Sequence, residues 1–368
     1  MPATLLTVDV SKKHVAGGGR NVPGLADEPL ELGALSDAFQ GLGGDPRVRV
    51  VAALATAEDG RASFTELFEA TDVETTAGFA YHLRQLDGQF VRSVVDDADD
   101  AGDAGDGDPE EGYALTDAGR RVARAIATGA YTDSVEIDAI PLDDACPLCR
   151  SDDGLQATVD DNVTTVACTD CGRDVLALPF PPSGYATRDP ETVPDAVDRH
   201  HRRRIASHVD GVCPDCGGPA TSTVEPLAAA EGDPTEHHRV RVAFACDACG
   251  ATASTPLSLA VLHHPAVVAA YHEHGVDVRD RPLWTVGADW RERVLSTDPW
   301  CVRATMETPN DDEDDDDDDD VLAAYVGADA TVVHVEELDE QEAPARITAD
   351  APDDGTGEDA TGEDGTPA

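Results

Sequence analysis

The sequence predicts an α+β protein in which a helical module precedes several small antiparallel sheets. Three observations predict this class. Apolar residues recur at helical spacing through the segment from Glu31 to Leu86. Four Cys-x-x-Cys pairs follow between Cys146 and Cys249, with strand-like runs between them. Strand-like runs also lie between Trp300 and Leu338, and they favour a short C-terminal β-meander.

Composition and periodicity divide the 368 residues into consecutive segments. We expect a flexible arm over residues 1–30, a helical module with two strands over residues 31–130, a tandem cysteine-rich domain with interleaved helices over residues 131–300, C-terminal strands with a poly-aspartate loop over residues 301–338, and a disordered acidic tail over residues 339–368. No element is predicted before residue 31 because that stretch shows no convincing periodicity.

Acidic residues dominate the composition. Asp and Glu number 75 against 26 Lys and Arg, which gives a formal net charge of −49, and Lys12 and Lys13 are the only lysines. This Asp-rich, Lys-poor composition is similar to that of cytosolic proteins from extreme halophiles. Disorder is the alternative that high net charge favours, but 40% hydrophobic residues in periodic segments argue that most of the chain folds.

The net charge does not exclude DNA as a partner in molar salt. The Debye length falls to about 3 Å at roughly 1 M salt, so surface charges are screened beyond contact distance. A DNA-binding protein of this charge would depend on close base contacts, buried surface and helix N-termini. We expect its binding to fail in dilute buffer.

The sequence indicates a cytoplasmic protein without a membrane partner. No apolar run reaches the roughly 18 residues that a membrane span requires. The N-terminal stretch MPATLLTVDVSKKHVAGGGR lacks an apolar core followed by a cleavage site.

Three helices are predicted in the first part of the helical module. The first places Leu32, Leu35 and Phe39 at helical spacing and ends at the glycine-rich GLGG. In the second, Asp45 is expected to cap the N-terminus and Pro46 to occupy the first helical position. The third begins with SFTE, a capping box in which a serine and a glutamate satisfy each other's backbone amides.

The stretch TTAGFAYHLRQL predicts a fourth helix with one buried and one exposed face. Phe79, Leu83 and Leu86 recur at core spacing. Arg and Gln side chains pair bidentately with guanine and adenine edges in the major groove, and the small residues at positions 77 and 78 would let the backbone approach closely. The candidate DNA contacts are Thr75, Thr76, Gly78, Tyr81, His82, Arg84 and Gln85.

Strand material follows this helix. FVRSVV at residues 90–95 and YALT at residues 113–116 flank an Asp/Gly-rich loop, and the helical stretch DAGRRVARAIATG closes the module. A strand, loop and strand after a recognition helix form a wing. The helical module is therefore predicted to be a winged helix-turn-helix.

The residues GFAYHLRQLDGQFV (78–91) and GYALTDAGRRVARAIATG (112–129) resemble the winged-helix domain of haloarchaeal ArsR-like transcriptional regulators. The resemblance covers roughly a quarter of the chain. It implies a homodimer that places one helix per subunit in successive major grooves of double-stranded DNA. Two features depart from the family. The wing is acidic from Asp96 to Glu111, and no cysteine precedes Cys146, which excludes the cysteine-based metal sensing on the recognition helix that some relatives use.

Eight of the nine cysteines form four Cys-x-x-Cys pairs, which in a reducing cytosol indicate metal ligands before disulfides. Two such pairs complete a tetrahedral zinc site, and a glycine follows each pair except the first, which Arg150 follows. Sequential pairing gives two zinc sites with four cysteine ligands each, although other pairings are open. The ligands are Cys146, Cys149, Cys168, Cys171, Cys213, Cys216, Cys246 and Cys249. Such sites are structural because four thiolates leave no position for water.

The cysteine-rich domain is predicted to be a duplicated zinc-ribbon and helix unit. Each copy would contain a pair, a strand, a second pair, a proline-containing extended piece and a His-bearing helix. The helix that contains DRHHRRRIASH has the densest basic cluster of the chain. This cluster is predicted either to contact a partner, which would be nucleic acid or the chain's own acidic segments, or to be a solvated face that pairs with neighbouring Asp residues. His263, His264, His272 and His274 form a weaker candidate for a further metal or ligand site.

The C-terminal part is predicted to contain a short helix and three strands. Trp284 and Trp290 suggest a helix that packs on the ribbons. WCVRATMET, VLAAYVG and TVVHVEEL are predicted strands, and DDEDDDDDDD is expected to be a solvated loop between the first two. Cys301 is expected to be a packed apolar residue.

Two functions from different classes follow from these predictions. The first is a dimeric DNA-binding transcriptional regulator, in which the winged helix binds an operator and the zinc ribbons contact a partner or effector. The second is a non-catalytic adaptor that binds proteins of the transcription or RNA machinery through both modules. A zinc enzyme is not predicted, since no general base, nucleophile or open metal position is evident.

Overall fold

The computed structural model describes residues 6–7, 32–95, 111–227, 240–307 and 321–338. It confirms the α+β class, with helices in the N-terminal region and several antiparallel sheets. Predictions for the wing loop, the poly-aspartate loop and the acidic tail concern residues outside these ranges. Within the described residues, no helix combines the length and apolarity needed to cross a membrane.

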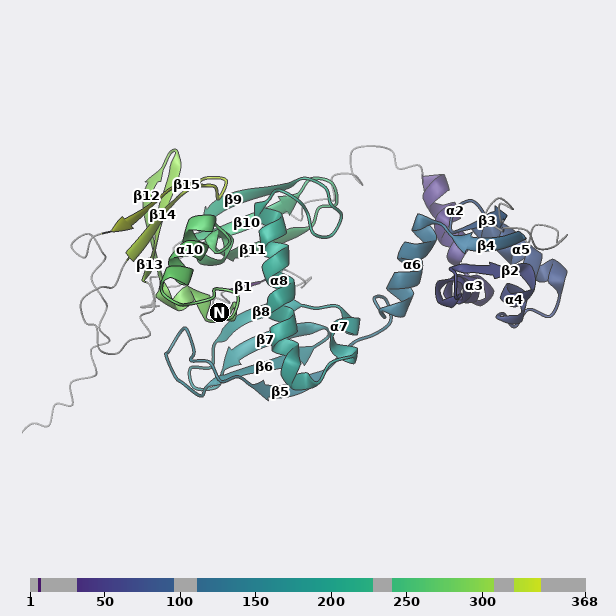
Figure 1. Ribbon diagram of the computed structural model, residues 1–368, viewed down its shortest axis with the longest axis horizontal. Coiled ribbons are helices and arrows are strands. Elements are labelled where there is room, and N and C mark those ends of the chain that lie inside the picture. The colour runs from purple at the N-terminus through teal and green to yellow at the C-terminus, as the bar shows by residue number, and fades with distance from the viewer. Residues whose placement is uncertain (1–5, 8–31, 96–110, 228–239, 308–320, 339–368) are drawn as a thin grey trace, which may run out of the picture.

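In its described residues, the N-terminal unit contains five helices around a three-stranded antiparallel sheet of order β2-β4-β3. Figure 1 shows it set apart from the remaining sheets, and α6 lies on the side nearest to them. Its elements are α2 (Leu32–Leu42), α3 (Asp45–Thr56), β2 (Arg61–Ser63), α4 (Phe64–Glu69), α5 (Thr76–Leu86), β3 (Val91–Val95), β4 (Glu111–Leu115) and α6 (Asp117–Ala127).

The helix starts in this unit agree with the sequence in one case and differ in another. The capping box at Ser63 and Glu66 is present, with both reciprocal bonds formed. At α3, however, the N-cap residue is Gly44 and Asp45 already lies in the helix, so the prediction that Asp45 caps it was wrong. Gly44 has a φ of 150°, a backbone conformation that favours glycine over a capping aspartate.

The core of the N-terminal unit lies where α3, α4 and α5 meet. Phe79 is fully buried, and the rings of Phe64 and Phe68 pack edge-on against it at centroid distances of 4.9 and 5.6 Å. Leu83 and Leu86 are buried on the same side of α5, as predicted. Phe39 departs from the predicted stripe on α2, because it is 76% exposed.

The first half of the cysteine-rich region forms a five-stranded sheet of order β1-β8-β7-β6-β5. Its strands are β1 (Leu6–Thr7), β5 (Ile137–Pro141), β6 (Leu155–Asp160), β7 (Val163–Cys168) and β8 (Asp174–Pro179). β1 pairs with β8 in parallel, so the expected flexible arm contributes an edge strand. The sequence could not predict β1, because a strand of two residues shows no periodicity. Its backbone nevertheless pairs with the edge of β8. The short helix α7 (Pro182–Ala186), the 3-10 turn η1 (Pro190–Thr192) and the long helix α8 (Val193–Val209) follow.

The second half repeats this order of elements. It contains β9 (Ala220–Pro226), β10 (Val240–Cys246) and β11 (Thr252–Pro256) in a sheet of order β11-β10-β9, then α9 (Leu257–Val261) and α10 (Pro265–Glu273). In each half two strands, rather than the single predicted one, lie between the paired cysteine motifs. Figure 1 shows α8 running past both sheets.

The C-terminal sheet is a four-stranded meander of order β12-β13-β14-β15. β13 (Trp300–Glu307), β14 (Val321–Gly327) and β15 (Val332–Leu338) match the predicted strands. The predicted helix was wrong beyond the short 3-10 turn η2 (Val286–Asp289), because Trp290–Thr297 forms β12. Trp290 is fully buried in a core that extends from Ile140 to Ala330, so this meander and the two cysteine-rich sheets share one core.

Candidate metal centres and nucleic-acid interface

The structure brings the eight paired cysteines together as two groups of four. In each group all four sulfur atoms lie within 4.8 Å of one another. Cys146 and Cys149 meet Cys168 and Cys171, whereas Cys213 and Cys216 meet Cys246 and Cys249. The pairing is therefore sequential, which resolves the alternatives that the sequence leaves open. Cys301 belongs to neither group and lies half-buried in β13.

The four Cys-x-x-Cys turns share one backbone geometry. In each, the amide of the first cysteine donates to the carbonyl of the fifth residue after it, at 2.8 to 2.9 Å. The fourth residue after it donates back to the cysteine carbonyl, also at 2.8 to 2.9 Å. That fourth residue has a positive φ: 67° at Gly172, 74° at Gly217, 72° at Gly250 and 61° at Arg150. Arg150 thus adopts the turn without the glycine that the other three turns use.

The sulfur separations fit a tetrahedral metal ion. Metal–sulfur bonds of about 2.3 Å place the thiolates of a four-cysteine zinc site about 3.8 Å apart. Cys149 Sγ lies 3.6 Å from Cys168 Sγ in the first group. In the second group, the sulfur of Cys216 lies 3.5 Å from that of Cys246, and Cys213 Sγ lies 3.8 Å from Cys249 Sγ. Both groups are therefore compatible with a structural metal ion held by four thiolates.

The surroundings of the sulfurs are also alike in the two groups. The first cysteine of each pair is buried, while the second is exposed or half-buried. Backbone amides point at the sulfurs: Leu148 N–H donates to Cys146 Sγ at 3.4 Å and Gly218 N–H to Cys216 Sγ at 3.3 Å. Such bonds stabilise thiolates, the form that binds metal. Four thiolates fill a tetrahedron, so the arrangement supports a structural role rather than catalysis at the metal.

Helix α5 presents most of the predicted DNA contacts on one exposed face. Thr75, Thr76, Arg84 and Gln85 are exposed, and Tyr81 is 52% exposed. Thr75 is the N-cap residue, and its Oγ1 accepts the Gly78 amide at 3.2 Å. The Arg84 Nε donates to the Ala80 carbonyl at 3.2 Å, so this side chain lies back along the helix.

Two predicted contacts lie differently. A Cβ at Gly78 would be 3.0 Å from Thr75 Oγ1 and 3.3 Å from Val73 Cγ1, so its free side faces the helix start rather than solvent. Its lack of a side chain leaves room for the N-cap of α5. His82 is half-buried and packs against the ring of Tyr81 at a centroid distance of 5.5 Å.

A family model described as a domain of unknown function (DUF7351) matches residues 143–332, more than half of the chain. The chain belongs to this family. A second model, also described as a domain of unknown function (DUF7347), matches residues 35–126. No curated protein and no solved structure matches. The DUF7351 match includes both groups of four cysteines, and the DUF7347 match includes α5 and the β3–β4 hairpin.

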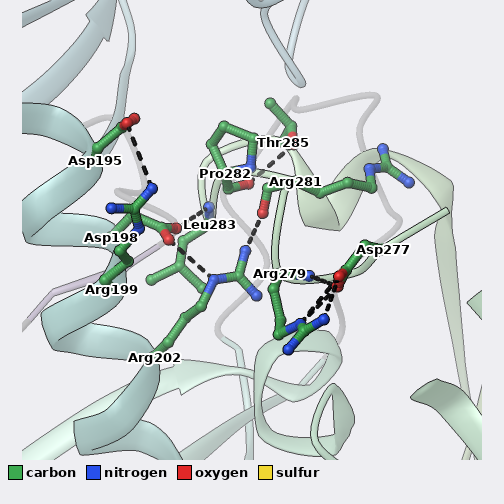
Figure 2. A network of polar contacts seen from close by, with 10 residues as sticks. All are labelled: Asp195, Asp198, Arg199, Arg202, Asp277, Arg279, Arg281, Pro282, Leu283 and Thr285. Atoms are coloured by element: carbon green, nitrogen blue, oxygen red, sulfur yellow. Dashed lines mark hydrogen bonds and ion pairs between the residues drawn. The ribbon is translucent and has the colours of Figure 1, made fainter. Parts of the chain in front are cut away.

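Within the DUF7351 region, the basic cluster on α8 divides into a buried and an exposed part. Arg202 is buried and its Nε donates to Asp198 Oδ2 at 3.0 Å. The same carboxylate accepts the Leu283 amide at 2.7 Å, and Arg202 Nη2 donates to the Arg281 carbonyl, as Figure 2 shows. Burial raises the pKa of Asp198, against the opposing influence of Arg202. The sequence did not reveal this network, because its partners are 79 and 85 residues apart.

Three histidines of the DUF7351 region, His201, His264 and His274, have hydrogen-bond partners within the fold. Burial lowers the pKa of His201 to about 4, and its Nε2 lies 2.8 Å from the Pro179 carbonyl, to which the neutral ring donates. The His264 ring caps α10, and His274 Nδ1 donates to the Ala270 carbonyl at 2.8 Å. Among the described residues, the two cysteine groups alone bring together three or more potential metal ligands. The histidines therefore form no additional metal site among the described residues.

Proposed function

We propose that this protein is a DNA-binding transcriptional regulator in which a winged helix-turn-helix binds an operator and two zinc ribbons stabilise the C-terminal region. The exposed face of α5 is the observation that supports it most. Arg84 and Gln85 lie there side by side in sequence, on a helix whose opposite face is anchored by Phe79 and Leu83. A helix fixed in this way presents side chains to the major groove in a defined register.

The order of elements around α5 supports the same proposal. α3 and α4 precede it, and the antiparallel pair of β3 and β4 follows it, which is the place of a wing. β4 also pairs with β2, so the hairpin is tied to the start of α4. Thr76 at the first turn of α5 would place a hydroxyl and free backbone amides near a phosphate, where a helix N-terminus favours negative charge.

A homodimer fits this proposal. Operators bound by winged helices are commonly palindromic, because two subunits place two equivalent helices one turn of DNA apart. Among the large apolar side chains that the described N-terminal unit exposes are Phe39 on α2 at 76% and Ile126 on α6 at 39%, which a partner subunit could cover.

The metal is proposed to be zinc, held by Cys146, Cys149, Cys168 and Cys171 in one ribbon and by Cys213, Cys216, Cys246 and Cys249 in the other. Zinc favours four-coordinate thiolate sites of this spacing. Its contribution would be to fix the two cysteine turns of each half against each other, so that the sheets present a stable surface to a partner or effector.

The adaptor remains the second candidate because of the same apolar exposure. Phe39 would then contact a protein of the transcription machinery instead of a second subunit. The two functions differ in whether Arg84 and Gln85 are needed for occupancy of chromosomal sites.

The test is to map chromosomal occupancy of the tagged protein in a halophilic host. We expect sharp sites that share a palindromic sequence, and we expect the double variant Arg84→Ala, Gln85→Ala to lose at least roughly tenfold in occupancy, since each bidentate contact contributes about 1–3 kcal/mol. The control is Arg121→Ala, which removes one exposed arginine from α6. Unchanged occupancy in the double variant, or occupancy that merely follows polymerase, would favour the adaptor.

A further inference from the structure

A concave pocket of about 780 Å³ lies between α7, α8 and the first cysteine turn of the second ribbon. Phe180 and Arg188 line it from the α7 side, Arg199 and Arg203 from α8, and Pro214 from the turn that contains Cys213 and Cys216. A volume of this order suits a small-molecule ligand, for which typical pockets measure about 300–1,000 Å³.

The lining is strongly basic in a strongly acidic protein. Arg188, Arg199, Arg203 and Arg204 all line the pocket, whereas the chain as a whole has 75 acidic and 26 basic residues. Among the described residues, Asp195 is the single acidic member of the lining. It lies 3.8 Å from Arg199 across an exposed pair, so it offsets only part of the positive charge.

The arginines differ in how far they are already engaged. Arg204 donates to Asp215 at 2.8 Å, and Arg188 donates to the Gly184 carbonyl at 2.6 Å. Arg203 is exposed and has no hydrogen-bond or ion-pair partner in the part of the chain that the structure describes. Its guanidinium is therefore available for a ligand that enters the pocket.

One wall of the pocket is aromatic. The Arg188 guanidinium lies 5.9 Å from the centroid of the Phe180 ring, and the His200 ring packs edge-on against Phe180 at 5.2 Å. Gly184 has no room for a side chain, since a Cβ there would overlap the Phe180 ring. This packing buries the Phe180 ring, which is 7% exposed, behind the pocket wall, whereas the His200 ring is half-buried there.

We propose that this pocket binds a phosphorylated small molecule of nucleotide size. Guanidinium groups match phosphate oxygens through paired N–H donors, and such short-range bonds persist in molar salt better than long-range attraction does. The half-buried ring of His200 would lie beside a base or another ring of such a ligand. The proposal does not depend on DNA binding by α5, because the pocket belongs to the cysteine-rich region.

The test is calorimetric titration of the full-length, zinc-loaded protein in molar KCl with ATP, AMP, adenosine, inorganic phosphate and a short DNA duplex. We expect ATP and AMP to bind and adenosine to bind far more weakly. Arg203→Ala should weaken ATP binding roughly tenfold or more, because the variant loses charge-assisted hydrogen bonds to the phosphate. Arg203→Lys, which retains the charge without the paired donors, should lie between.

The matched control is Arg293→Ala, which removes an exposed arginine from β12, away from the pocket lining. It should leave ATP binding unchanged. ATP affinity that is the same in wild type and Arg203→Ala would overturn the assignment of the site. If ATP, AMP and phosphate all fail to bind, the proposal is wrong. It is also wrong if the DNA duplex binds through Arg203 while the nucleotides do not, because the pocket would then bind a DNA backbone.

Discussion

At the scale of single residues, the ion pair of Asp198 and Arg202 links α8 to the segment 281–283 in the C-terminal core. Both side chains are less than a tenth exposed, at 8% and 7%. Asp198 Oδ1 accepts the Leu283 amide and Arg202 Nη2 donates to the Arg281 carbonyl, so the pair holds the segment before β12 against α8 (Figure 2). A buried pair of this kind is costly to break from one side, because the remaining charge has no partner.

We therefore expect Asp198→Asn to lower the free energy of unfolding by roughly 3–5 kcal/mol, the usual cost of leaving one buried charge without its partner. The amide can still accept the Leu283 amide proton, but it no longer neutralises Arg202. Denaturant unfolding in molar KCl measures this loss. The dependence of the unfolding free energy on denaturant concentration should be the same in both proteins, which excludes a change in the unfolded state.

The same helix provides a matched control. Asp195 and Arg199 have the same spacing and lie on the exposed side of α8, with both side chains about two-thirds exposed, at 67% and 69%. Asp195→Asn removes the same charge, yet screening by salt should leave stability unchanged within error. If Asp198→Asn and Asp195→Asn lower the free energy of unfolding equally, burial of the Asp198 pair does not contribute to the cost of breaking it.

At the scale of elements, the cysteine turn is the unit that the sequence predicted best. The residue spacing and the glycine after the second cysteine specify the turn locally, and the structure repeats it four times. Which pairs meet depends on sheet pairing instead: β6 with β7, and β9 with β10, bring the turns together. The spacing of the cysteines along the chain therefore indicated the metal ligands, whereas the pairing of the strands determines which cysteine pairs share a site.

Metal content tests the two groups separately. We expect wild type to contain two zinc ions per chain, one for each group of cysteines. Cys171→Ser should reduce the content to one, because a serine hydroxyl is a poor zinc ligand. Cys301→Ser is the control, since Cys301 lies in neither group. Plasma mass spectrometry after removal of free metal measures the ratio; two ions in the Cys171 variant would contradict the proposed coordination.

Elements whose pairing depends on distant partners were missed or assigned wrongly. β2 consists of Arg61–Ser63, too short for an alternating pattern, and it forms because β4 offers an edge. β12 was predicted as a helix from Trp284 and Trp290, but its backbone pairs with β13 and buries Glu292. Strand propensity did not identify WRERVLST, because this segment contains three charged residues. Their place in a strand depends on the neighbouring strand of the sheet, which the sequence of the segment does not show.

At the scale of the whole molecule, the described residues form two main cores that share no residue. One includes Val50, Phe79 and Ala123, and the other extends from Ile140 to Ala330. Sequence periodicity predicted the α5 side of the first core, where Phe79, Leu83 and Leu86 are buried, but it wrongly included Phe39 of α2, which is exposed. The second could be placed only in outline, since its apolar residues come from short strands whose burial depends on how three sheets pack.

Separate cores predict separate unfolding transitions. Both metal groups lie in the part of the chain that builds the second core, where Cys146 and Cys168 are buried members. Structural zinc contributes folding free energy directly, about 10–16 kcal/mol in isolated zinc-finger peptides, so its removal should unfold or strongly destabilise this core alone. We expect calorimetry in molar KCl to show two transitions, of which EDTA lowers one by more than about 10 °C and leaves the other in place.

The double variant Cys171→Ser, Cys249→Ser should reproduce the effect of EDTA without a chelator, because it removes one ligand from each group. Helical circular dichroism then assigns the unaffected transition, since the N-terminal unit is mainly helical and the other core is mainly strand. A single transition that moves as a whole on metal removal would show that the two cores unfold together. In that case the metal ions would stabilise the face of α5 as well, and occupancy of DNA sites would depend on zinc.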